Sequence, residues 1–116
     1  MLEQDWNAAR QPRKGLRFEH PTHLSVTADA TLTTNDPEFI HLDATAGIMT
    51  VTLPTPYLGL VYHLSEIAGL ATAITIDAGA GLTVNGARMA TMNTPYAQRK
   101  LRGISATAWI IVGEVS

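Results

Sequence analysis

The stretch "AITIDAGAGLTVNGA", residues 73–87, sets glycines and alanines between two short apolar segments. Ile74 and Ile76 alternate with polar or small residues, as on one face of a β-strand. The segment 77–81, "DAGAG", predicts a glycine-rich corner, because glycine adopts positive φ without steric cost. Asn85-Gly86 is typical of a two-residue hairpin turn, in which both central residues need positive φ. The stretch therefore predicts strands joined by tight turns.

The same glycines do not match a phosphate-binding loop. Such a loop needs a lysine and a hydroxyl residue after its last glycine, and then a helix whose N-terminus faces the anion. Here Gly86 leads into "ARMATM" instead, and the spacing of the glycines differs from the dinucleotide-binding fingerprint. We therefore expect turn chemistry here and no nucleotide or other cofactor.

From residue 25 onward the chain is a series of short β signals rich in Val, Ile and Thr. Gly, Pro, Asn or Asp separates one signal from the next, and no helical periodicity appears. The clearest strands fall in "EFIHLD" (38–43), "GIMTVTLP" (47–54) and "GLVYHLSEIAG" (59–69), with Ile40, Leu42, Met49, Val51 and Leu53 predicted to face the core. This pattern predicts an all-β fold.

The size of the chain favours one domain and self-association. Its 116 residues are 46% apolar, but a core this small buries only about 60 to 65% of the surface of the unfolded chain. Cysteine is absent, so no disulfide offsets that weakness. We expect a homotrimer. The sequence shows no signal-peptide pattern and no apolar run near the roughly 20 residues that cross a bilayer, so we expect no membrane partner.

The first 24 residues differ in composition from the rest and predict an extended N-terminal docking arm (1–24) ahead of a β-sandwich domain (25–116). They carry prolines, and their apolar residues are too widely spaced for a core strand. Aromatic and arginine residues together are typical of an anchoring segment, although a frayed terminus is the alternative. The residues predicted to dock on a partner are Trp6, Arg10, Arg13, Lys14, Arg17 and Phe18.

Charge is unevenly distributed along the chain, whose formal net charge is −2. Residues 26–87 contain no lysine or arginine, and their acids are Asp29, Asp36, Glu38, Asp43, Glu66 and Asp77. A nucleic-acid-binding domain usually spreads basic residues over one folded face. We therefore expect no nucleic-acid partner.

The residues that could support catalysis lack the spacing that catalysis needs. His41 and His63 belong to separate predicted strands, and His41 with Asp43 offers at most a pair of metal ligands, whereas zinc sites use three or four. No serine sits in a glycine elbow, and there is no cysteine nucleophile. We expect no enzyme, no metal and no small-molecule substrate. The alternative from another class is a small jelly-roll enzyme with a metal on His41 and His63.

Three segments taken together, "TVTLPTP" (50–56), "ITIDAGAGLTVNGA" (74–87) and "ATAWIIVG" (106–113), resemble the small β modules of tailed-phage virions. Such modules occur in fibres and capsid decoration proteins, and they are generally trimeric sandwiches or jelly rolls. The resemblance therefore implies a small antiparallel β-sandwich or a jelly-roll-like barrel. The resemblance covers about residues 31–113. Two features depart from the pattern: Ala108 precedes the closing tryptophan in place of Ser, Asn or Gly, and the arm has no counterpart.

The resemblance implies a capsid decoration (cement) protein, made in the host cytoplasm and carried on the outer surface of the virion. A trimer would bind the major capsid protein lattice at three-fold and quasi-three-fold positions and stabilise the head. The alternative is a tail fibre or baseplate module, with host glycan as one ligand. The loops "DATAG", "DAGAG" and "NGA" carry no aromatic ring for sugar stacking, which favours the decoration hypothesis.

Overall fold

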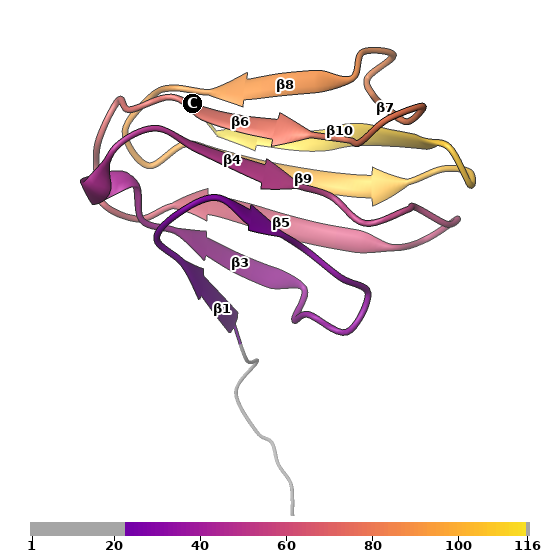
Figure 1. The fold of residues 1–116 in the computed structure, drawn as a ribbon, viewed down its shortest axis with the longest axis horizontal. Helices are drawn as coiled ribbons and strands as arrows, with labels where there is room; N and C mark the ends of the chain where they lie inside the picture. Colours follow the sequence, from indigo (N-terminus) through magenta and orange to yellow (C-terminus); the bar gives the residue numbers. More distant parts are fainter. Residues whose placement is uncertain (1–22, 116) are drawn as a thin grey trace, which may run out of the picture.

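The computed structural model describes residues 23–115, and these form an all-β fold of two facing sheets (Figure 1). The prediction of an all-β chain in two sheets is confirmed. The strands are β1 (His23–Val26), β2 (Ala30–Thr31), β3 (Phe39–Leu42), β4 (Met49–Thr52), β5 (Val61–Glu66), β6 (Ile74–Asp77), β7 (Thr83–Val84), β8 (Met89–Met92), β9 (Gln98–Gly103) and β10 (Ala108–Val115). A 3-10 turn, Ala44–Ala46, lies between β3 and β4.

The chain winds as a coil through the two sheets. The six-stranded sheet has the order β1-β3-β5-β9-β10-β7, and the four-stranded sheet has the order β2-β4-β6-β8. The first six strands therefore alternate between the sheets, and each of β1 to β4 pairs in parallel with the strand two places further along the chain. In Figure 1 the odd and even strands of this coil run in opposite directions. This is the arrangement of a β-solenoid, closed by the antiparallel pairs β5–β9, β9–β10 and β6–β8.

The two facing sheets are consistent with the predicted β-sandwich, but the strands are not all antiparallel, and the chain forms a β-solenoid coil instead of the predicted jelly roll. Alternation of apolar and polar residues shows that one face of a strand is buried and the other exposed, but it does not give strand direction. Parallel sheets usually lack this alternation because helices cover both faces. Here the outer faces of both sheets carry no helix among residues 23–115, so parallel strands alternate as antiparallel ones do. The crossover that parallel strands require is supplied by a strand of the opposite sheet.

The core lies between the sheets and is built from the inward residues of nearly every strand. The side chains predicted to face inward in β3 and β4 are buried, with Ile40, Leu42 and Val51 at 0% exposure. Burying one such aliphatic side chain contributes about 1.5 to 3 kcal/mol. The core therefore depends on the alternation that the sequence shows.

Trp109 on β10 closes this core. It is fully buried, with its ring centroid 5.8 Å from that of Tyr62, whose hydroxyl donates a hydrogen bond to the carbonyl of Thr33 at 2.6 Å. Burial, with smaller contributions from Asp36 and Tyr57, raises the pKa of Tyr62 to about 12. The hydroxyl of Tyr62 is therefore a hydrogen-bond donor over the whole physiological pH range.

The stretch 73–87 forms the turn that its sequence predicts. Asn85 and Gly86 have φ of 51° and 83°, and the main chains of Val84 and Ala87 hydrogen-bond to each other in both directions. The pairing ends there, because β7 joins β10 in one sheet while β8 joins β6 in the other. The turn was correctly predicted, but it moves the chain between sheets instead of starting a long hairpin.

Candidate interaction surface

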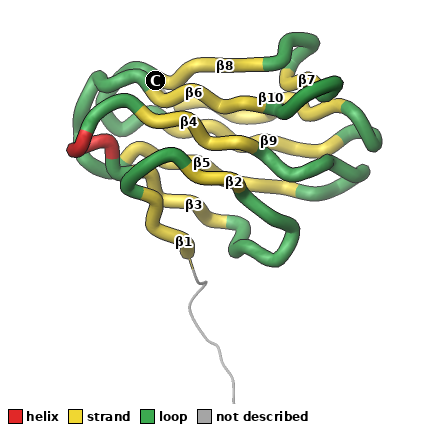
Figure 2. Tube along the Cα trace, viewed as in Figure 1, coloured by secondary structure: helices red, strands yellow, loops and turns green. Residues whose placement is uncertain are grey.

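The loops between strands gather at the two ends of the coil (Figure 2). One end includes residues 54–60, between β4 and β5, and residues 104–107, between β9 and β10; we call it the proline end. The opposite end includes residues 67–73, between β5 and β6, and residues 93–97, between β8 and β9; we call it the carboxylate end. The two ends are held by different chemistry.

Main-chain contacts fix the proline end. The N–H of Gly59 donates to the carbonyl of Gly103 at 3.0 Å, and the N–H of Gly103 donates to the carbonyl of Leu60 at 2.7 Å. Leu60 also donates to the carbonyl of Tyr57 at 3.1 Å, which closes a turn. A Cβ on Gly103 would lie 2.3 Å from that same carbonyl oxygen, so only glycine allows the loops to approach this closely.

This rigid end exposes large apolar side chains. Tyr57 is 53% exposed, Leu58 71% and Ile104 43%. Leu58 and Ile104 lie beside the two glycines whose main chains join the loops, so they project from one fixed structure. Exposed aromatic and aliphatic side chains on a rigid support are typical of the anchors of a protein interface, because little conformational entropy is lost when they bind.

A buried carboxylate fixes the opposite end. Glu66 is 2% exposed, and its Oε1 accepts hydrogen bonds from the main-chain N–H groups of Gly69 at 2.8 Å, Leu70 at 3.1 Å and Tyr96 at 3.2 Å. Its Oε2 accepts from the N–H of Ala68 at 2.8 Å. Burial alone would raise the pKa of Glu66, but these four bonds outweigh it and hold the pKa below the usual value. One side chain thus joins two loops.

Tyr96 completes that junction in an unusual conformation. Its φ is 58°, a region that residues other than glycine seldom occupy, and its side chain covers Gly69 so closely that a Cβ there would lie 2.7 Å from the tyrosine hydroxyl. The ring is nevertheless 61% exposed, and Ile48 at 81% is a second exposed apolar residue in the loops of this end. Both ends therefore offer apolar surface, and at this end a single buried carboxylate joins two loops.

The remaining carboxylates that the sequence singled out have structural partners. The Asp77 carboxylate accepts from the guanidinium of Arg88 at 3.1 Å and from the N–H of Gly79, which lowers its pKa. Hydrogen bonds from the hydroxyl and N–H of Thr45 lower the pKa of Asp43 in the same way. These acids hold turns in place.

The structure separates the histidines and acids considered as metal ligands. Asp43 caps the 3-10 turn, and His41 stacks on His23 with ring centroids 4.2 Å apart. His41 lies opposite Ser65 in the sheet, whereas His63 lies opposite Phe39, so the two histidines do not share a row. Among residues 23–115, no group of three His, Cys, Asp or Glu residues is placed to hold a metal ion.

The predicted docking residues lie outside the part of the chain that the structure describes. They are Trp6, Arg10, Arg13, Lys14, Arg17 and Phe18. Sequence reasoning missed Tyr57 and Leu58, because it assigned residues 47–54 and 59–69 to strands and gave the segment between them no role. The available signal was an aromatic residue and a leucine between prolines and a glycine, in a segment without the alternation that would bury them.

Two comparisons complete this description. No protein-family model matches the chain, and no curated protein matches its sequence. Within the described residues, no helix has the length and apolar character to cross a membrane. The interpretation of function therefore depends on the residues and geometry given above.

Proposed function

We propose that this chain is a non-enzymatic structural protein of a tailed-phage virion. As a homotrimer it decorates the head, binds the outside of the major capsid protein lattice at three-fold and quasi-three-fold positions, and stabilises the shell. The resemblance of residues 31–113 to virion β modules and the two-sheet body support this proposal. The observation that carries it is the rigid apolar surface of the proline end.

The geometry of the proline end suits attachment to a preformed lattice. Its loops are already fixed by hydrogen bonds, so little conformational entropy would be lost when Tyr57, Leu58 and Ile104 bind a partner. The burial of their apolar area would then contribute directly to affinity. A trimer would present three such ends at once. Simultaneous binding at one three-fold position raises the overall affinity without any new type of contact.

The edges of the sheets support self-association. Among the described strands, β1 and β7 are the edges of the larger sheet, and β2 and β8 are those of the smaller. Edge strands leave main-chain hydrogen-bonding groups available, and symmetric assembly is a common way to cover them. Three copies around one axis would protect some of these edges.

The experiment uses heads of the phage whose genome carries this gene, prepared from a strain that lacks the chain. Purified chain is added, and the amount that sediments with the heads is measured. We expect the double variant Tyr57→Ser and Leu58→Ser to lose at least tenfold in apparent affinity, and the control Val112→Ser, an exposed residue of β10, to bind normally. Unchanged binding by the double variant would refute the assignment of the docking surface.

A tail fibre or baseplate module is the second candidate, and the parallel coil favours it. Solenoid coils bury their faces by stacking on one another, which suits an elongated assembly. Separating heads from tails and measuring the chain in each fraction distinguishes the two. Recovery with tails alone would support the fibre or baseplate proposal over decoration.

A further inference from the structure

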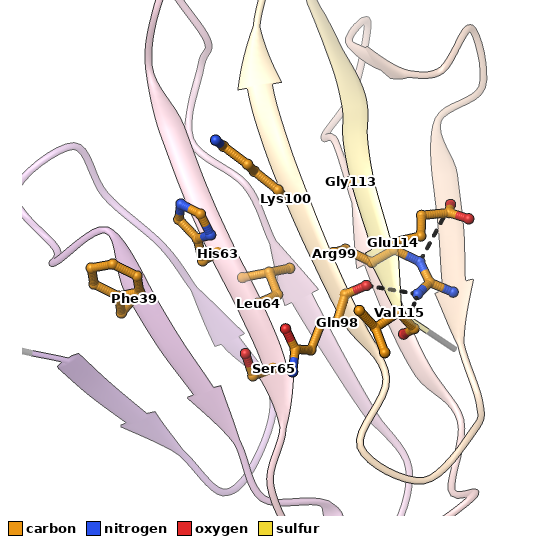
Figure 3. Close-up of a pocket in the computed structure, with 10 residues that line it drawn as sticks. All are labelled: Phe39, His63, Leu64, Ser65, Gln98, Arg99, Lys100, Gly113, Glu114 and Val115. Atoms are coloured by element: carbon orange, nitrogen blue, oxygen red, sulfur yellow. Dashed lines mark hydrogen bonds and ion pairs between the residues drawn. The ribbon is translucent and has the colours of Figure 1, made fainter.

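The outer face of the six-stranded sheet has a groove of about 340 Å³ that the proposed docking surface does not use (Figure 3). It lies across β3, β5, β9 and β10. The residues that give it its chemistry are Phe39, His63, Ser65, Gln98, Lys100 and Gly113. The volume falls within the range of small-molecule sites.

The groove exists because one position in a row of side chains is a glycine. Phe39, His63, Lys100 and Gly113 lie opposite one another on successive strands. A register shift in β10 just before Gly113 places this residue beside Lys100. With no side chain there, the row ends in a hollow. A Cβ would meet only the Cβ of Lys100, at an ordinary contact distance of 3.5 Å.

One wall of the groove is formed by two stacked aromatic rings. Phe39 stacks on His63 with ring centroids 4.9 Å apart and an interplanar angle of 26°. The Nε2 of His63 lies 2.8 Å from a carboxylate oxygen of Glu38, which fixes the imidazole against the ring. His63 lies between Phe39 and Lys100 in the row and its side chain is 31% exposed, so the face of the imidazole turned away from Phe39 is available to a ligand. An aromatic face of this kind stacks on the apolar C–H groups of a ring-shaped ligand.

The charges of the groove favour an anion. Its carboxylate, Glu114, pairs with Arg99 at 3.6 Å. Lys100 is exposed and forms no ion pair with any residue between 23 and 115. In Figure 3 its side chain extends from β9 toward β5, on the side of the sheet that carries His63. The hydroxyl of Ser65 and the amide of Gln98 supply neutral hydrogen-bonding groups.

We propose that this groove binds one residue of an acidic sugar, a pyranose ring that carries a carboxylate. The ring would stack on the face of His63 that is turned away from Phe39, the carboxylate would bind Lys100 through a charge-assisted hydrogen bond, and sugar hydroxyls would bind Ser65 and Gln98. A single cation matches a single carboxylate. Nucleic acid binds less well to such a face, because its affinity comes from neutralising several phosphates. The groove lies on a side face, so head attachment through the proline end leaves it accessible.

The test is an NMR titration of the ¹⁵N-labelled full chain with D-glucuronate, with D-glucose as the uncharged control. We expect glucuronate to shift the amide signals of Ser65, Lys100 and Gly113, and glucose to shift them at much higher concentration. Lys100→Gln should weaken glucuronate binding about tenfold, the loss expected for one hydrogen bond to a charged group. Arg102→Gln, on the same strand and face but outside the groove, is the matched control and should bind normally.

A second variant tests the shape of the groove independently of its charge. Gly113→Val fills the hollow, and the room around this glycine allows the sheet to keep its fold, which the same spectra report. Loss of glucuronate binding in this folded variant is expected. Equal binding of glucose and glucuronate, unaltered binding by either groove variant, or tighter binding of a single-stranded oligonucleotide than of glucuronate would each overturn the proposal.

Discussion

The two ends of the coil show two ways of fixing loops on one scaffold. At the carboxylate end, four main-chain N–H groups converge on the ionised side chain of Glu66. At the proline end, main-chain groups bond to one another and a glycine permits their close approach. The first arrangement depends on a charge and hence on pH. The second does not, and it leaves the large side chains of Tyr57 and Leu58 free for contact.

The largest effect is expected at Glu66. Glu66→Ala removes the buried acceptor of four hydrogen bonds and leaves partly buried N–H groups without that partner, so we expect the free energy of unfolding to fall by about 4 kcal/mol. Glu114→Ala is the control, because that carboxylate is exposed and its ion pair contributes at most about 1 kcal/mol. Urea unfolding measures both. Equal losses of unfolding free energy in Glu66→Ala and Glu114→Ala would contradict the role of Glu66 in fixing the carboxylate end.

At the proline end, the corresponding destabilising variant is Gly103→Ala. The added Cβ would collide with the carbonyl oxygen of Tyr57, so the loops must separate, and we expect a loss of about 3 kcal/mol. Gly113→Ala, on the next strand, has room for the methyl group and should cost less than about 1 kcal/mol. Thermal or urea unfolding of the pair checks this prediction, and similar stabilities would show that the loops do not need their close approach.

Acid should weaken the carboxylate end through protonation of Glu66. The pKa of Glu66 is lower in the folded chain than in the unfolded chain, where it is about 4.5. Its contribution to stability is therefore complete above that value and is lost as pH falls through the folded pKa. Asp77 and Asp43 act in the same direction. We expect urea unfolding between pH 6 and pH 3 to show a smaller acid-induced loss in Glu66→Gln than in the wild type; parallel losses would contradict this role.

The smallest effect on stability concerns the exposed apolar residues. Leu58→Ser at the proline end and Ile48→Ser in a loop of the carboxylate end should each change the free energy of unfolding by no more than about 0.5 kcal/mol. Their effects on head binding should differ, because only the proline end is proposed to dock. Reduced sedimentation with heads is expected for Leu58→Ser alone. Reduced binding by Ile48→Ser alone would place the docking surface at the opposite end.

Local features of this fold could be predicted from the sequence, and long-range pairing could not. The alternation in 38–43 and 47–54 correctly identified the core faces of two strands, and Asn85-Gly86 correctly identified a turn. Parallel pairing was missed because turn residues show where the chain changes direction but not which strand it joins next. The coil became evident only from the register of β1 with β3 and of β2 with β4.

The candidate site was less predictable than the fold, for a related reason. Glu66 occupies the inward position that follows Tyr62 and Leu64, so its burial could be read from the pattern, but its four partners come from two separate loops. The need for glycine at 103 arises from a carbonyl more than forty residues earlier in the chain. Lys100 and Gly113 meet only because β9 and β10 pair with a shift in register. Such contacts depend on tertiary structure.

The central proposal is that this chain decorates a phage head as a trimer attached through its proline end. Cryo-electron microscopy of heads from the phage that encodes it tests this claim most directly. The account predicts three copies around each occupied three-fold or quasi-three-fold position, with Tyr57, Leu58 and Ile104 against the coat protein. Heads that carry no density for the chain, or copies bound with the proline end facing solvent, would contradict it.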